Sequence, residues 1–89
     1  MQLTSIPGVG VSLATDLRDL GFTKVEDLAD ADPERMFEDL CRMRGVRIDR
    51  CVLYVFRCAA YFASNDNPDP EKLKWWNWKD RAIAKSAHA

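Results

Sequence analysis

A glycine-containing turn near the N-terminus is the part of this chain best suited to binding chemistry. The segment Ile6-Pro7-Gly8-Val9-Gly10 leads directly into Leu13 and Leu17, which have helical apolar spacing. Glycine adopts positive φ without a Cβ clash and allows close approach to the backbone. The first N–H groups of the next helix lack intrahelical acceptors, and the helix dipole is positive there. This pattern predicts an anion site at Gly8, Val9, Gly10, Val11 and Ser12. The same residue types also favour a plain tight turn.

A second turn with a different character follows further along the chain. The segment Arg44-Gly45-Val46-Arg47 has one glycine, and Arg50 comes shortly after it. Guanidinium groups bind phosphate oxygens well. If the first turn binds one DNA strand through backbone amides, this turn can bind the other strand through charge. The candidate residues here are Arg44, Gly45, Arg47 and Arg50.

Helices must position these two turns, and the whole chain is predicted to be helical. Apolar spacing predicts helices over about 2–5, 11–20, 24–29, 33–43, 49–63 and 70–79. Their boundaries come from local signals. These are Gly21 as a left-handed helix end, Thr23 with Glu26 as a capping box, Asp32-Pro33 and Asp69-Pro70 as starts, Gly45 as a stop and Asp49 as a cap.

The first five helices form a repeat of two helix-turn-helix units joined by the 24–29 helix. This order predicts an all-α fold, a paired helix-hairpin-helix (SAM-like) five-helix domain over 1–63. A loop and a tryptophan-rich C-terminal helix over 64–80 are expected to pack on that domain. Residues 81–89 are expected to form a fraying tail.

Charge is unevenly distributed although the net charge of the 89 residues is only −1. Acidic residues dominate 16–39, whereas arginines dominate 42–57. This asymmetry indicates either a polarised binding surface or ordinary solvated faces. In the 49–63 helix, Arg50, Tyr54, Arg57 and Tyr61 share one face. That stripe suits phosphate and base contacts, or the edge of a core covered by Trp75, Trp76 and Trp78.

Few residues of this chain are suited to metal binding or catalysis. Cys41, Cys51 and Cys58 have no metal-binding spacing, and His88 lies in the tail. We therefore expect buried, reduced thiols, no metal and no catalytic function. No apolar run is long enough to span a membrane, and no secretory signal precedes the first helix, so a cytoplasmic location is expected.

Two segments resemble a known family. Cys51-Val-Leu-Tyr-Val-Phe-Arg-Cys58, together with Leu73-Lys-Trp-Trp-Asn-Trp-Lys-Asp80, is similar to the small prokaryotic "pathogenicity locus" helix-hairpin-helix proteins, some of which carry a mitomycin-resistance label. The hairpin half also resembles the C-terminal domain of TfoX-type competence regulators. The resemblance implies a helix-hairpin-helix fold, DNA binding and, by analogy, a monovalent cation bridging hairpin carbonyls and phosphate. Val11 departs from the pattern of DNA-binding hairpins, which often have Lys, Arg or a small polar residue just after the second glycine.

Two functions follow from these observations. The first is sequence-nonspecific binding to the DNA backbone, in connection with repair or uptake. The alternative is a protein–protein interaction module that has this fold and does not bind DNA. The neutral first turn, the acidic helices and the tryptophan-rich segment favour the alternative.

Overall fold

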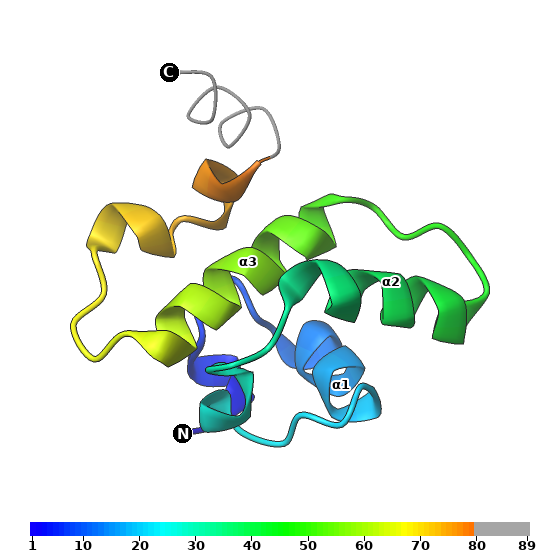
Figure 1. The fold of residues 1–89 in the computed structure, drawn as a ribbon, viewed down its shortest axis with the longest axis horizontal. Coiled ribbons are helices and arrows are strands. Elements are labelled where there is room, and N and C mark those ends of the chain that lie inside the picture. The colour runs from blue at the N-terminus through cyan, green and yellow to red at the C-terminus, as the bar shows by residue number, and fades with distance from the viewer. Residues whose placement is uncertain (80–89) are drawn as a thin grey trace.

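The computed structural model describes residues 1–79, which form three α-helices and four 3-10 turns (Figure 1). The α-helices are α1 (Val11–Asp19), α2 (Pro33–Arg44) and α3 (Cys51–Ser64). The 3-10 turns are η1 (Leu3–Ser5), η2 (Val25–Leu28), η3 (Pro70–Leu73) and η4 (Trp75–Trp78). No strand occurs over these residues, so the predicted all-α class is confirmed for them. The tail expected over 81–89 lies outside the described residues.

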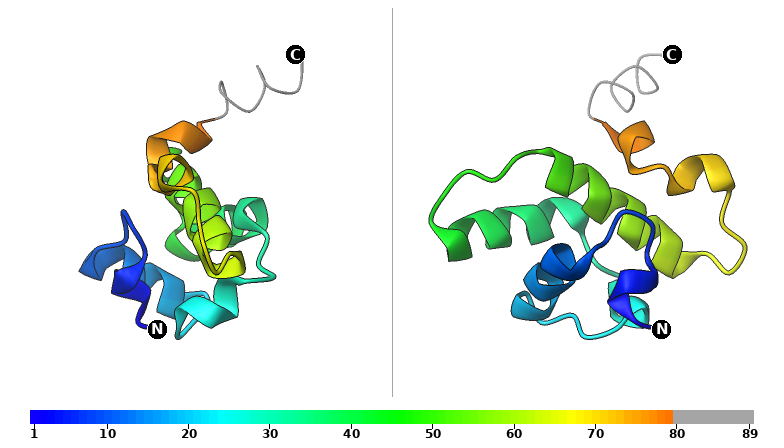
Figure 2. Two further views of the ribbon diagram at one scale, coloured as in Figure 1. Left: turned by 90° about the vertical axis from the view of Figure 1, so that its left-hand side faces the viewer. Right: turned by 180° about the vertical axis from the view of Figure 1, so that it is seen from behind.

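Helix α3 is the central element of the fold. In Figures 1 and 2, α2 lies on one side of α3 and the η3–η4 segment on another, while η1, α1 and η2 gather below. This position follows from the sequence of α3, which is apolar on most of its circumference. The buried cluster consists of Leu3, Ile6, Val9, Ala14, Leu17, Val25, Leu28, Met36, Leu40, Val55, Phe56 and Ala59.

Local signals set the ends of the α-helices as predicted. Gly21 has φ +102°, and its N–H and that of Phe22 donate to the carbonyls of Arg18 and Leu17 at 2.9 Å, which closes α1. The Asp32 side chain accepts the N–H of Glu34 at 3.1 Å and caps α2. Further predicted boundaries also hold: Gly45 ends α2 with φ +69°, and Asp49 accepts the N–H of Cys51 at 2.9 Å.

The predicted helix count is not confirmed, because the first and third predicted helices are single 3-10 turns. The predicted 70–79 helix is also wrong, since it is broken at Lys74, whose ψ is 107°. Side-chain N–H groups donate to carbonyls that would accept backbone N–H groups in a continuous α-helix. The Asn77 amide donates to the Glu71 carbonyl, and the Trp78 indole donates to the Lys72 carbonyl, each at 2.7 Å.

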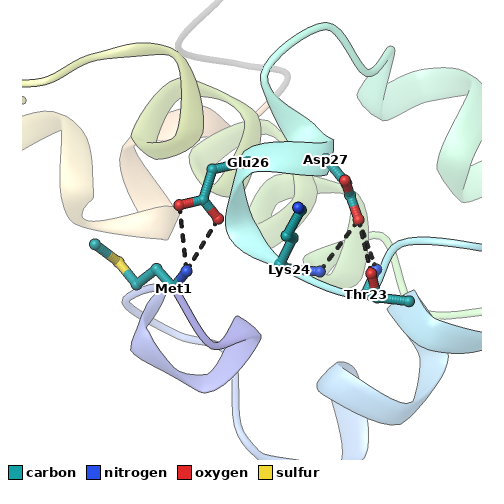
Figure 3. A network of polar contacts seen from close by, with 5 residues as sticks. All are labelled: Met1, Thr23, Lys24, Glu26 and Asp27. Atoms are coloured by element: carbon teal, nitrogen blue, oxygen red, sulfur yellow. Dashed lines mark hydrogen bonds and ion pairs between the residues drawn. The ribbon is translucent and has the colours of Figure 1, made fainter.

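The predicted capping box of Thr23 with Glu26 is wrong, as Figure 3 shows. Asp27 accepts the N–H groups of Thr23 and Lys24 at 3.0 and 3.2 Å, and also the Thr23 hydroxyl. The hydrogen bond from the N–H of Thr23 holds the pKa of Asp27 below its ordinary value, because it stabilises the carboxylate. Glu26 instead accepts from the amine of Met1 at 3.0 Å, which ties the N-terminus to η2.

Candidate nucleic-acid interface

The first turn leads into α1 without a side-chain cap. Gly8 has φ +87°, and Gly10 is extended and precedes α1 as its N-cap. The first intrahelical bond runs from the Ala14 N–H to the Gly10 carbonyl at 2.9 Å. Among residues 1–79, no side chain caps α1, and its first turn has no acidic residue. The leading N–H groups therefore point out of the helix with no carboxylate competing for them.

Solvent reaches this turn on the side of Gly10. No described atom would lie within 4 Å of a Cβ added to Gly10. Val11 is 77% exposed, and Ser12 is also exposed. Val9, in contrast, is buried in the core and anchors the turn. A phosphate can therefore approach the backbone of Gly10, Val11 and Ser12.

Gly8 has a neighbour within the protein that the sequence did not predict. A Cβ at this position would lie 3.0 Å from Cδ1 of Trp75 and 3.8 Å from Cγ1 of Val55. The absence of a side chain at Gly8 thus allows the indole of Trp75 to lie close to the backbone of the turn. The sequence analysis missed this contact, although a cluster of three tryptophans indicated that some apolar surface had to receive them.

Arg44 forms ion pairs with two carboxylates of α1. One of its terminal nitrogens, Nη2, lies 2.7 Å from a carboxylate oxygen of Asp16 and 2.7 Å from one of Asp19. These two carboxylates raise the pKa of Arg44 further and hold the end of α2 against α1. The predicted phosphate contact of Arg44 therefore competes with two short ion pairs.

The other charged residues of the second turn are open to solvent. Arg47 is exposed and forms no ion pair with residues 1–79, and Arg50 is an exposed residue directly before α3. The structure does not bring the two turns into one patch. The first turn lies at the start of α1, whereas Arg44, at the second turn, pairs with Asp19 at the end of α1. The two ends of α1 are about 13 Å apart, because the helix has nine residues.

The arginine–tyrosine stripe of α3 is covered over part of its length by the 70–78 segment. The side chain of Arg57 is 11% exposed, with Nε 2.8 Å from Glu34 Oε1 and Nη1 donating to the Trp78 carbonyl at 2.8 Å. The rings of Tyr61 and Trp78 are 5.5 Å apart. Arg57 lies over the ring of Tyr54. These contacts favour the core-edge interpretation of the stripe.

The three cysteines differ in exposure, so the prediction that all three thiols are buried is wrong for Cys51. Cys51 is exposed because it begins α3, Cys41 is half-buried and Cys58 is buried. Burial raises the pKa of Cys58 to about 11, and its thiol donates to the Leu73 carbonyl at 3.4 Å. The Asp49 carboxylate raises the pKa of Cys51. No metal-binding group of three ligands is present within residues 1–79.

This exposure pattern predicts selective alkylation of the native protein. Maleimide should modify Cys51 first, whereas Cys58 should react only as the domain unfolds, because it is buried and its thiolate is scarce at neutral pH. Mass spectrometry of peptides after timed labelling, with and without denaturant, measures both rates. Equal rates at Cys51 and Cys58 without denaturant would contradict the arrangement.

The comparisons with known proteins agree with the resemblance noted in the sequence. The model of the family described as "Pathogenicity locus" matches residues 1–84. The chain is similar to a Streptomyces lavendulae protein named "Mitomycin resistance protein McrB", with 29% identity over 90 residues that cover 98% of this chain and 82% of the relative. No solved structure matches. None of the described helices is long and apolar enough to cross a membrane. Since the family match spans nearly all of its length, the chain belongs to the Pathogenicity locus family.

Proposed function

We propose that this domain is a non-catalytic, cytoplasmic module that binds the DNA backbone without reading base sequence. The observation that carries the proposal is the N-terminus of α1. Its leading N–H groups are uncapped by side chains of residues 1–79, no acid lies in its first turn, and the space above Gly10 is open. Such donors suit a phosphate oxygen and cannot distinguish bases.

The order of elements supports a paired helix-hairpin-helix arrangement. The turn between η1 and α1 forms one hairpin, the turn between α2 and α3 forms the other, and η2 connects them. Arg47 and Arg50 contribute charge at the second hairpin. Arg44 contributes indirectly, because its ion pairs with Asp16 and Asp19 hold the second hairpin relative to α1.

Two substitutions of Val11, one by a cation and one by an anion, test this proposal. Val11→Lys should strengthen duplex binding and steepen the salt dependence of log K by about one unit, because one more phosphate is neutralised. Val11→Asp should weaken binding to every sequence alike, since a carboxylate would occupy the donors. Fluorescence anisotropy over a salt series measures both effects, and the exposure of Val11 allows either side chain.

Ala29→Lys is the matched control, because it adds the same charge at an exposed residue after η2. Equal gains from Val11→Lys and Ala29→Lys would indicate general electrostatic attraction and not a site at α1. If the folded wild type does not bind duplex DNA at about 50 mM salt, where phosphate contacts are strongest, DNA binding is excluded.

A protein-interaction module is the second candidate, favoured by the apolar side chains on the surface. Val11 is 77%, Val46 61%, Met43 51% and Trp76 49% exposed. Val11 and Val46 lie in or beside the two turns, where a DNA-binding hairpin gains more from polar residues. In this case Val11→Asp would abolish capture of a protein partner, and DNA would not compete with that partner.

A further inference from the structure

Trp76 is the one exposed aromatic residue among residues 1–79, with 49% of its surface open to solvent. The ring of Trp75 supports it edge to face, with the ring centroids 5.8 Å apart. Its backbone belongs to η4, which is fastened to α3 because the Arg57 guanidinium donates to the Trp78 carbonyl at 2.8 Å. An exposed indole on a backbone held in this way offers a surface on which a second planar ring can stack.

This indole lies beside the first turn. In both views of Figure 2, the turn rises toward the η3–η4 segment. Trp75 makes the contact, since its Cδ1 would lie 3.0 Å from a Cβ on Gly8. A single side chain therefore links Trp76 to the turn, and Gly10 follows Gly8 by two residues, at most about 7 Å along the chain. Trp76 and the start of α1 thus belong to one face of the molecule.

The charge of this face suits a polyanion. Residues 1–15 contain no charged side chain, and the acidic stretch of the sequence begins at Asp16. Over 70–79, one glutamate is outnumbered by three lysines, which are Lys72, Lys74 and Lys79. That glutamate, Glu71, pairs with Lys74 at 3.1 Å. An aromatic ring beside an excess of lysines is the combination by which proteins bind single-stranded nucleic acid.

We propose that Trp76 stacks on an unpaired base of a DNA strand whose phosphate lies at the first turn, so that single-stranded DNA is the preferred ligand. The inference rests on the proposed DNA-binding function and adds its substrate class. Every base has a flat face, so stacking distinguishes sequences no better than the backbone contacts do. Within an intact duplex these faces are covered by neighbouring base pairs, and exposing one costs unstacking energy.

Fluorescence anisotropy with the full chain at about 50 mM salt tests the preference, using three labelled probes. The probes are a thymidine oligomer of about 12 nucleotides, a blunt duplex of the same length, and an abasic strand with the same phosphates and no bases. The wild type should bind the thymidine oligomer at least about fivefold more tightly than either of the other probes, because stacking on one base contributes at least that factor.

Substitution of Trp76 tests the stacking contact itself. Trp76→Ala should weaken binding of the thymidine oligomer at least about fivefold and leave its salt dependence unchanged, because stacking releases no counterions. Trp76→Phe retains an aromatic ring and should keep most of the affinity. Met43→Ala is the matched control, because Met43 is apolar, 51% exposed and located on α2.

Three results would overturn the inference while duplex binding still supported the proposed function. These are tighter binding of the duplex than of the thymidine oligomer, equal binding of the thymidine and abasic strands, and equal effects of Trp76→Ala and Met43→Ala. If the folded wild type binds none of the three probes, the inference and the proposed function are both overturned.

Discussion

Replacing Gly8 with alanine should destabilise the domain by about 2–3 kcal/mol, which lowers the melting temperature by roughly 10–20 °C for a domain of this size. Two costs add together. The φ of +87° disfavours any L side chain by about 1–2 kcal/mol. The new Cβ would also lie 3.0 Å from Cδ1 of Trp75, so the indole must move. Thermal and urea denaturation followed by circular dichroism measures the loss.

Two other glycines separate these costs. Gly45 has φ +69° and open space around its Cβ position, so Gly45→Ala should show the backbone strain alone, about 1 kcal/mol. Gly10 has an ordinary φ of −93° and open space, so Gly10→Ala should change stability by less than about 0.5 kcal/mol. Equal losses at Gly8 and Gly45 would show that Trp75 does not lie against the turn.

Helix ends in this protein were predictable because short-range backbone chemistry determines them. The side chain of Asp32 accepts backbone N–H groups two and three residues further on, which starts α2. The positive φ of Gly21 and Gly45 ends α1 and α2. The choice between α-helix and 3-10 turn at 70–78 was not predictable in this way. It depends on which side chains compete for the Glu71 and Lys72 carbonyls.

The candidate site was only partly predictable, because some of its residues contact side chains that are far away in the sequence. Trp75 approaches Gly8 from the far end of the chain, and Asp16 with Asp19 engage Arg44. Neither contact has a local signature. The N-terminus of α1 could be predicted from its own residues, since Gly10 and the lack of a capping side chain are local properties.

Trp75→Ala should lower the free energy of unfolding by about 2–3 kcal/mol, whereas Trp76→Ala should lower it by less than about 0.5 kcal/mol. The two residues are neighbours with the same side chain, so they form a matched pair. Trp75 is half-buried and packs against the core cluster, while Trp76 is 49% exposed and meets Trp75 edge to face at 5.8 Å. Chemical denaturation of both variants measures the difference.

Combining Trp75→Ala with Gly8→Ala then tests whether the C-terminal segment supports the first turn. Once the indole is gone, Gly8→Ala should cost only its backbone strain, about 1–2 kcal/mol. The double variant should therefore be more stable than the sum of the single losses predicts. Strict additivity would mean that the two residues do not touch. On the proposed DNA-binding function, Trp75→Ala should also weaken DNA binding in the folded protein, because the N–H groups at the start of α1 lose a rigid support. Trp76→Ala should leave the binding of duplex DNA intact, and a loss of partner binding in that variant alone would favour the protein-interaction module.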